Sequence, residues 1–221
     1  MTTPQHNLAV IKVVGIGGGG TNAIKRMIGE GMTGVDFIAL NTDEQDLLDC
    51  DAPTKLDIGQ STTRGLGAGA DPAVGERAAR DNSQDIEDVL TGADMVFVTA
   101  GEGGGTGTGG APIVAGIARD LGALTVAVVT KPFSFEGKRR AENAANGIEK
   151  LRDACDTLIT IPNDRLLQQE DKTISINDAF SKADEVLFNG VQGITDLIST
   201  PGLINVDFAD VKSVLADSDA A

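Results

Sequence analysis

The sequence predicts an α/β fold: a Rossmann-like parallel sheet with helices on both faces, and a long central helix at its C-terminal end. Three observations predict it. Apolar, β-branched runs alternate along the chain with helix-like segments. The runs are apolar throughout, which is typical of parallel strands that are covered on both faces. Glycine-rich loops follow several of these runs, and loops after parallel strands meet at one edge of the sheet.

The expected strands come first. Each is a short run rich in Val, Ile, Leu and Thr, and the last is stopped by Pro162. In chain order they cover residues 8–14, 35–40, 54–58, 95–100, 124–130 and 157–161.

The expected helices fall between and after these strands, where apolar residues recur at helical spacing. We expect the last one to be long and interrupted only at Gly190 and Gly193. They cover about residues 21–30, 73–81, 83–91, a segment from 111 onward, 137–154 and 176–199.

Residues 101–110 read Gly-Glu-Gly-Gly-Gly-Thr-Gly-Thr-Gly-Gly, between a strand and a helix. Such a turn leaves free backbone N–H groups at the positive end of the helix, and glycine lets the chain approach an anion closely. Thr106 and Thr108 add hydroxyl donors. The run lacks the Lys that ends a P-loop, so N–H groups and a metal ion are expected to neutralise a bound phosphate. A flexible linker, the alternative, fits poorly between two regular elements.

The earlier glycine run matches the dinucleotide-binding pattern at Gly15, Gly17 and Gly20, with Asp36 about where a ribose ligand is expected. Taken alone, this pattern predicts an NAD-dependent dehydrogenase. However, Asp36 lies near the start of its strand instead of the carboxyl end, and a dehydrogenase leaves the second run without a role. The one histidine, His6, lies in the terminal tail, away from any hydride transfer. A nucleoside triphosphate gripped by several loops fits better.

Composition excludes other classes. The 221 residues carry a net charge of −15 and only 3% aromatic residues, which disfavours a nucleic-acid or anionic-membrane surface. Cys50 and Cys155 lack metal-binding or redox spacing, so we expect two free thiols in a reducing cytoplasm. No apolar stretch is long enough for a transmembrane helix, and residues 1–7 do not resemble a secretory signal.

Six segments in one register resemble the tubulin/FtsZ superfamily and, within it, the FtsZ family of bacterial cell-division GTPases. The most specific is Gly103-Gly104-Gly105-Thr106-Gly107-Thr108-Gly109, the superfamily signature, and the resemblance runs from about residue 7 to residue 214. The other segments are 17–22, 41–43, 132–137, 162–167 and 205–210.

The resemblance implies a GTP/GDP site with Mg²⁺. The run 103–109 would wrap the β- and γ-phosphates, Gly18 and Gly19 would approach the α- and β-phosphates, and the loop at 68–70 would close over the γ-phosphate. Asn41 and Asp43, at the end of the second strand, would approach the metal or the phosphates.

The remaining implied contacts are to ribose and base. Glu136 and Arg140 would bind ribose and phosphate, while Asn163 and Asp184 would hydrogen-bond guanine and Phe180 would stack on it. From the residues alone, Arg140 is a solvated helix charge and Phe180 a core side chain. The full set of implied nucleotide-binding residues is Gly18, Gly19, Thr21, Asn22, Asn41, Gly69, Ala70, Gly101, Gly104, Gly105, Thr106, Gly107, Thr108, Gly109, Glu136, Arg140, Asn163, Phe180 and Asp184.

Asn205, Asp207 and Asp210 follow the long helix. From the residues alone this is an exposed turn, with Asp210 capping a helix that begins at Val211. In the resembled family the loop is the catalytic element, and it acts on the nucleotide of the next subunit by orienting the attacking water. Two half-sites at opposite ends of a subunit make a heterologous contact, which builds filaments.

The resemblance therefore implies a cytoplasmic GTPase at the mid-cell division site, which polymerises head to tail with its own copies into the bacterial division ring. Other division proteins are expected partners; nucleic acid and direct membrane insertion are not. The alternative function is a non-catalytic GTP-binding fragment that caps full-length filaments.

The expected domain organisation has four parts: a disordered tail over residues 1–7, a GTP-binding domain over 8–175, the long helix over 176–199, and the catalytic loop with the start of a second domain over 200–221. Family members continue beyond this point, so we expect a truncated chain. The missing domain would leave apolar positions of the long helix exposed.

Overall fold

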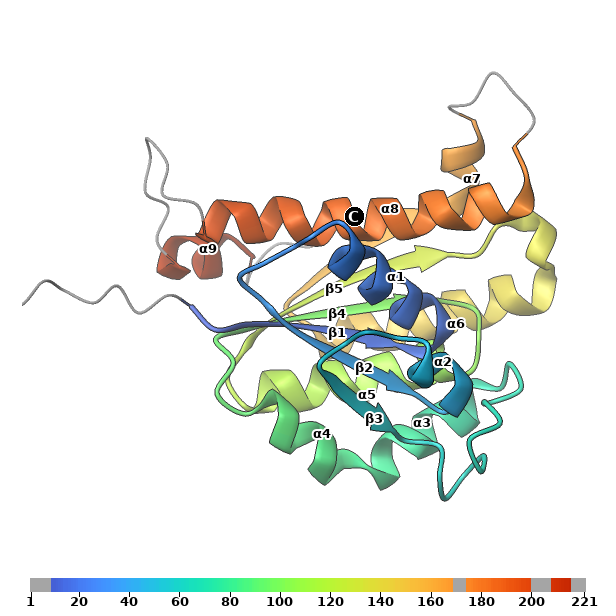
Figure 1. Ribbon diagram of the computed structural model, residues 1–221, viewed down its shortest axis with the longest axis horizontal. Helices are drawn as coiled ribbons and strands as arrows, with labels where there is room; N and C mark the ends of the chain where they lie inside the picture. The colour runs from blue at the N-terminus through green and yellow to red at the C-terminus, as the bar shows by residue number, and fades with distance from the viewer. Residues whose placement is uncertain (1–8, 169–173, 200–207, 216–221) are drawn as a thin grey trace, which may run out of the picture.

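A six-stranded sheet forms the centre of the computed structural model, which describes residues 9–168, 174–199 and 208–215 (Figure 1). Every neighbouring pair of strands is parallel, and their order is β3-β2-β1-β4-β5-β6. The predicted fold class is confirmed. The strands are β1 (Ile11–Ile16), β2 (Asp36–Asn41), β3 (Thr54–Asp57), β4 (Met95–Gly101), β5 (Leu124–Lys131) and β6 (Thr157–Pro162).

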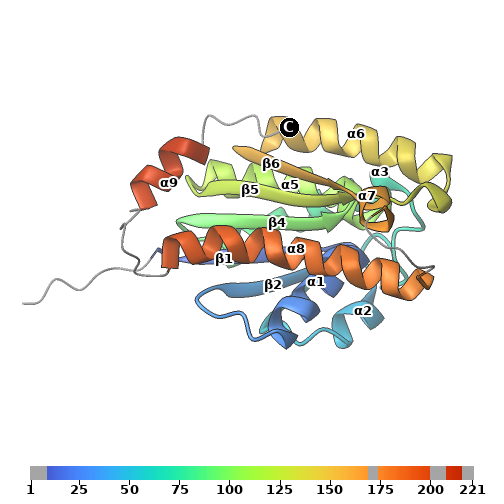
Figure 2. The ribbon, with the colours of Figure 1, turned by 90° about the horizontal axis from the view of Figure 1, so that it is seen from above.

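Helices cover both faces of this sheet. They are α1 (Gly17–Gly29), α2 (Glu44–Leu48), α3 (Pro72–Asp81), α4 (Ser83–Leu90), α5 (Thr106–Asp120), α6 (Lys138–Ala154), α7 (Asn163–Leu167), α8 (Ile176–Ser199) and α9 (Phe208–Leu215), with a 3₁₀ helix, η1 (Ser134–Glu136). Apolar residues of α3, α4, α5 and α6 pack on one face, and those of α1, α2 and α8 pack on the other. Figure 2 shows α8 lying along the direction of the strands.

The strands alternate their buried side chains between these two layers. In β4, Val96 and Val98 face the α5 layer, whereas Met95 and Phe97 face the α8 layer, and all four are buried. Burial on both faces explains why the strands are apolar without alternation. Cys50 and Cys155 are buried free thiols, as predicted. Within the described ranges, no helix combines the length and hydrophobicity needed to cross a bilayer.

Two helices begin earlier than predicted, inside the glycine runs. α1 starts at Gly17 instead of about residue 21, and α5 starts at Thr106 instead of about residue 111. Glycine has a low helix propensity, but close packing overrides it here. A Cβ on Gly20 would lie 2.6 Å from the carbonyl oxygen of Thr99, and one on Gly109 only 1.9 Å from that of Pro72.

The C-terminal part also differs from expectation. α8 continues without a break through Gly190 and Gly193, because its buried face packs along the sheet. α9 begins at Phe208, so Asp210 lies in its first turn and does not cap a helix starting at Val211. The short helices α2, α7 and η1 were not predicted.

The strand order places a topological switch between β1 and β4, whose following helices α1 and α5 pack on opposite faces. In such sheets ligands bind beyond the carboxyl ends of the strands at this switch point. Both glycine runs follow these two strands, so the fold brings them together at the expected edge.

Candidate nucleotide-binding site

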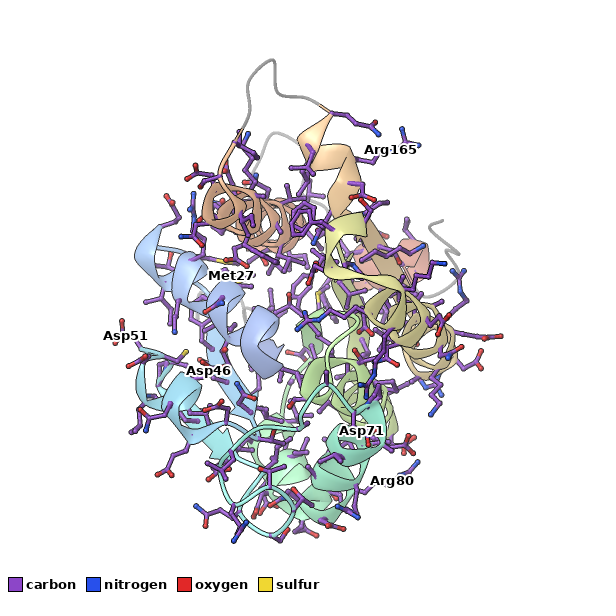
Figure 3. The ribbon with its side chains drawn as sticks, turned by 90° about the vertical axis from the view of Figure 1, so that its right-hand side faces the viewer. Met27, Asp46, Asp51, Asp71, Arg80 and Arg165 are labelled. Atoms are coloured by element: carbon purple, nitrogen blue, oxygen red, sulfur yellow. The ribbon has the colours of Figure 1, made fainter. Side chains whose placement is uncertain are left out.

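A cavity of about 440 Å³ opens at the carboxyl edge of the sheet, between the turns that follow β1 and β4. Figure 3 views the molecule from this edge, with Asp46 of α2 and Asp71 before α3 marking two of the contributing elements. The lining residues come from the β1–α1 turn, the end of β2, the loop before α3, the β4–α5 turn and the starts of α6, α7 and α8. Its size and its mixture of small and polar lining groups suit a nucleotide.

The two glycine turns touch each other at the cavity floor. A Cβ on Gly17 would lie 2.8 Å from the backbone nitrogen of Gly107, and one on Gly19 would lie 2.9 Å from that of Gly101. Gly17 also has a φ of +68°, which lets β1 turn directly into α1. Any larger residue would push these backbones apart, so the contact requires glycine.

The cavity floor presents backbone donors. The first turns of α1 and α5 both line it, and their first N–H groups have no partner within the helix. The N–H groups of Gly104 and Gly105 donate to no described residue. Several converging N–H groups at two helix N-termini favour an anion such as a phosphate.

A third loop, residues 64–71, closes one side of the cavity through Gly67 and Ala70. Its first half is fixed by the Gly65 carbonyl, which accepts from the Glu44 N–H at 3.1 Å, and by the Gly67 N–H, which donates to the Thr42 carbonyl at 3.0 Å. Its end is fixed by Asp71, whose side chain caps α3 by accepting from the Ala73 N–H at 2.9 Å. The loop is therefore held at two points beside the glycine turns.

The opposite side of the cavity combines Asn163, Phe180 and Asp184. The Asn163 side chain is buried, and its Oδ1 has no hydrogen-bond partner in the described part of the chain. The ring of Phe180 is 39% exposed and meets the rings of Phe133 and Phe135 edge-on. A half-exposed ring beside an unpartnered amide suits a flat heterocyclic base.

Burial raises the pKa of Asp184 to about 6, although the charges of Arg26 and Lys25 lower it in part. The carboxyl group is therefore ionised at pH 7. A carboxylate accepts two parallel hydrogen bonds, the pattern that guanine offers through N1–H and N2–H₂ and that adenine lacks.

Glu136 and Arg140 form an ion pair at the cavity rim, with the Arg140 Nη1 2.9 Å from the Glu136 Oε1. The other oxygen of Glu136 accepts from the Phe133 N–H at 2.8 Å. The pair is thus held in place at the junction of η1 and α6. Arg140 is half exposed, so its guanidinium remains available to a bound polar group.

Glu102 is the cavity residue that the sequence reasoning missed most clearly. It follows β4, is 3% exposed, and lines the cavity. Burial raises its pKa to about 8, so the side chain is a neutral acid at pH 7. The nearby Thr108 hydroxyl opposes this shift, but its geometry gives neither carboxylate oxygen a hydrogen-bond partner among the described residues. Burial therefore determines the direction of the pKa shift of Glu102, which is upward.

Most of the predicted nucleotide-binding residues line this one cavity. Four do not: Thr21 donates to the Gly18 carbonyl at 3.1 Å, Thr108 accepts from the Gly103 N–H at 2.8 Å, and Gly69 and Gly109 lie in supporting backbone. The residues that line the cavity are Gly18, Gly19, Asn22, Asn41, Ala70, Gly101, Gly104, Gly105, Thr106, Gly107, Glu136, Arg140, Asn163, Phe180 and Asp184. Additional lining residues are Ile16, Gly17, Asp46, Gly67, Glu102, Thr130, Pro132, Ala183 and Leu187; Asp43, expected near the phosphates, lines it too.

Of the three predicted catalytic residues, the structure describes Asp210 alone. Asn205 and Asp207 lie outside the described residues. Asp210 is exposed on α9, beyond the other end of α8, and it does not line the cavity. In Figures 1 and 2, α9 and α7 lie at opposite ends of α8.

Among the described residues, no cluster of three or more His, Cys, Asp and Glu side chains is placed to hold a metal ion. Asp46 nevertheless lies beside the first glycine turn, since a Cβ on Gly18 would be 3.2 Å from its Oδ2. Mg²⁺ at nucleotide sites is bound by phosphate oxygens, waters and one or two carboxylates. The residues therefore fit a magnesium ion held mainly by the ligand.

Fold and site together define a class, the Rossmann-like domains with a nucleotide-sized cavity between glycine turns that lack a P-loop lysine. Residues 10–171 match the Tubulin/FtsZ family, GTPase domain, and the chain belongs to this family. It is similar to "FtsZ dimer, empty (M. jannaschii)" at 50% identity and a TM-score of 0.92, over 96% of this chain and 62% of that one.

A second solved structure, "CetZ1 from Haloferax volcanii - GDP bound monomer", is 24% identical, with a TM-score of 0.78 over 94% of this chain and 64% of that one. At this identity the likeness shows the fold alone. The chain thus spans a little under two thirds of the length of these relatives.

Proposed function

We propose that the chain binds and hydrolyses GTP and polymerises head to tail into the filaments of the bacterial division ring, with each active site completed in trans by the next copy. The observation that carries this proposal is the separation of the cavity and α9 along α8. Phe180 and Asp184, near its start, line the cavity, whereas α9 follows its end.

This separation supports catalysis in trans, because Asp210 lies far from the cavity of its own chain. The 24 residues of α8 span about 36 Å at 1.5 Å per residue. α9 contacts the opposite edge of the sheet, where the Thr157 hydroxyl at the start of β6 donates to the Leu215 carbonyl. A second copy stacked on the cavity edge brings its own acidic segment to the phosphates. That contact joins unlike surfaces, so it propagates into a filament.

Nucleotide binding follows from the cavity geometry. The N–H groups of the two glycine turns hold the phosphates, Ala70 lies at the terminal phosphate, and Glu136 with Arg140 holds the ribose and phosphate. Asn163 and Asp184 hydrogen-bond guanine beside Phe180. Asp46, together with the phosphate oxygens of the nucleotide, would hold Mg²⁺, which would supply positive charge to offset the developing negative charge.

Hydrolysis needs positioning more than covalent chemistry. The carboxylates of Asp207 and Asp210 from the next copy orient a water in line with the γ-phosphorus, and Asn205 helps to place it. The water oxygen bonds to phosphorus as the bond to the bridging oxygen of GDP breaks. The solved FtsZ dimer from M. jannaschii is similar to this chain, and this likeness supports self-association. We propose mid-cell assembly with other division proteins on the same family grounds.

A mixing experiment tests catalysis in trans. Asp207→Ala keeps the cavity but lacks an intact acidic loop, and Asp184→Ala keeps the loop but lacks the base-recognition carboxylate. Each variant alone should release little phosphate from GTP. A mixture should regain turnover, because the loop of one variant completes the cavity of the other.

The matched control is Asp85→Ala, which removes an exposed carboxylate of α4 and should hydrolyse GTP like the wild type. Full turnover by Asp207→Ala alone, or an inactive mixture of two folded variants, contradicts the proposal. Identification of the nucleotide released by mild denaturation also separates a GTPase from the NAD-dependent alternative. Shortening of full-length filaments by the chain, without turnover, would instead support the capping alternative.

A further inference from the structure

Asn143 of α6 links two loops that face the cavity. Its Nδ2 donates to the Ala70 carbonyl at 3.2 Å and to the Gly103 carbonyl at 3.3 Å. The side chain is half-buried and does not itself line the cavity. One uncharged carboxamide therefore ties the loop before α3 to the glycine turn after β4.

The bond to Gly103 fixes the direction of a phosphate-facing donor. In a trans peptide the C=O and the following N–H point in opposite directions. Because the Gly103 carbonyl points to Asn143, the Gly104 N–H points away from Asn143. Gly104 lines the cavity, and its N–H donates to no described residue. Asn143 therefore helps to hold this donor ready for a ligand.

The bond to Ala70 supports an unfavourable backbone conformation. Ala70 has a φ of +59°, which costs free energy for a residue with a Cβ and persists only where the surroundings fix it. A second support near this point is the Asp71 N–H, which donates to the Ala68 carbonyl at 3.1 Å. Two other positions of the loop pack loosely. A Cβ on Gly69 would meet nothing within 4 Å, and Leu66 is 76% exposed. The loop holds five left-handed residues: Arg64, Gly65, Gly67, Gly69 and Ala70.

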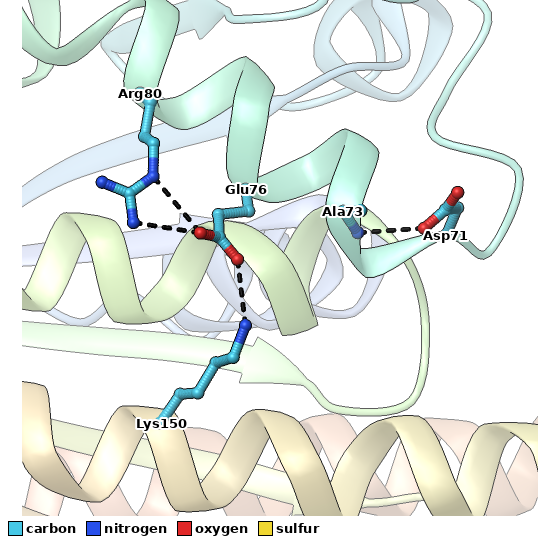
Figure 4. A network of polar contacts seen from close by, with 5 residues as sticks. All are labelled: Asp71, Ala73, Glu76, Arg80 and Lys150. Atoms are coloured by element: carbon cyan, nitrogen blue, oxygen red, sulfur yellow. Dashed lines mark hydrogen bonds and ion pairs between the residues drawn. The ribbon is translucent and has the colours of Figure 1, made fainter.

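α6 provides a fixed base for Asn143. One turn later, Gly147 allows close contact with α5, since a Cβ there would lie 2.4 Å from the Thr108 Cγ2. Further along, the Lys150 Nζ lies 3.0 Å from the Glu76 Oε2 of α3 (Figure 4). Asp71 caps the start of the same α3. The helix is thus braced against both elements that follow the two loops.

We propose that Asn143 is a positioning residue that holds the loop 64–71 and the Gly104 N–H around the terminal phosphate, and so makes the site prefer nucleoside triphosphate over diphosphate. This inference rests on the proposed GTP site. Its consequence is specific: weakening the tie affects the ligand with a third phosphate far more than the ligand without it.

The test compares dissociation constants of GTPγS and GDP, measured calorimetrically with Mg²⁺ on the purified chain. Asn143→Ala removes both hydrogen bonds, and Asn143→Leu removes them while keeping the side-chain volume without adding charge. Either should reduce the preference for GTPγS over GDP by roughly 5- to 30-fold, as expected for two hydrogen bonds. Asn146→Ala is the matched control, because Asn146 is exposed on the same helix and its side chain makes no hydrogen bond to a described residue.

Three outcomes overturn the inference. If both Asn143 variants keep the wild-type preference for GTPγS, Asn143 does not have the proposed role. The GTP site itself then stands, since GDP still binds. Equal losses for both nucleotides indicate a general structural effect. A wild-type chain that binds neither nucleotide overturns the GTP site itself, and the role of Asn143 with it. The inference is supported if both Asn143 variants lose affinity for GTPγS much more than for GDP while Asn146→Ala binds both nucleotides like the wild type.

Discussion

Glu102 shows how burial sets the chemistry of one residue at the cavity. An ionised carboxylate without partners is costly in the protein interior, so the folded chain keeps this group protonated at neutral pH. A neutral acid also avoids repelling a phosphate bound at the adjacent turn. The site can therefore hold a polyphosphate in a strongly acidic protein, whose net charge is −15.

This protonation predicts a pH-dependent stability. The pKa of Glu102 is about 8 in the folded chain against an ordinary value of 4.5, so between these values the folded state retains a proton that the unfolded chain releases. The free energy of unfolding should fall as pH rises from about 5 to 8, by up to ~1.4 kcal/mol per pH unit. Glu102→Gln should remove most of this slope between pH 6 and 8, above the folded-state pKa of Asp184, whose raised value adds a slope of the same sign below pH 6. Urea unfolding of the nucleotide-free chain measures both profiles.

The control for Glu102 is Glu149→Gln on α6, an exposed glutamate whose replacement should leave the pH slope unchanged. Parallel profiles for the wild type and Glu102→Gln would show that the buried carboxyl group titrates normally and that its environment is more polar than described.

The sequence predicted some residues at the cavity and missed others, and the difference has a physical reason. The glycines and threonines in the two runs can be recognised from the local sequence, because close approach of the backbone requires them there. Asn143 and Glu102 carry no such local signal. The role of Asn143 depends on carbonyls 40 and 73 positions away, and that of Glu102 on how deeply the fold buries it. Only the assembled structure supplies these facts.

At the scale of elements, α5 contains glycines with opposite roles. Gly109 lies against α3, where an added Cβ would be 1.9 Å from the Pro72 carbonyl oxygen. Gly116, on the same helix, has nothing within 4 Å of an added Cβ. Packing thus requires the first glycine, whereas the second only lowers helix propensity.

We expect Gly109→Ala to destabilise the chain by about 3 kcal/mol, because α3 and α5 must separate. Gly116→Ala, the matched control, should stabilise it by ~0.5–1 kcal/mol through helix propensity. Urea unfolding midpoints of the two variants give the comparison. Equal effects of the two substitutions would mean that α3 yields without cost.

The contrast between packing and helix propensity also explains which helices and strands could be predicted from the sequence. All six strands and the longer helices were predicted, because uniform apolar runs and helical periodicity are strong over several turns. The starts of α1 and α5 were wrong by four or five residues, because propensity argues against helix within glycine runs and only packing reverses it. α2 and α7, of five residues each, are too short for periodicity to indicate them.

At the scale of the whole molecule, the cavity and α9 occupy opposite edges of one sheet. The family resemblance implied two half-sites at opposite ends of a subunit, and the topology places the cavity and α9 at opposite ends of the strands. Leu197 on α8 is 63% exposed and Ile176 is 62% exposed, so apolar side chains remain at both ends of this helix.

Assembly-linked catalysis predicts that GTP turnover per subunit rises with protein concentration, since each site needs a neighbour. Phosphate release and light scattering, recorded together at saturating GTP, measure turnover and assembly. Asp207→Ala should still scatter light with GTP while releasing little phosphate. Turnover per subunit that is independent of concentration would mean that one chain carries a complete active site.

Because α8 is unbroken, a small rotation at one end of this helix produces a larger displacement at its other end. Phe180 and Asp184 lie near its first turns, and its far end leads toward α9. A tilt of about 5° around the end that lines the cavity displaces the far end of a 24-residue helix by ~3 Å, about the length of a hydrogen bond. In the proposed filament, a small adjustment of these side chains to a bound base would therefore reposition the surface offered to the next copy.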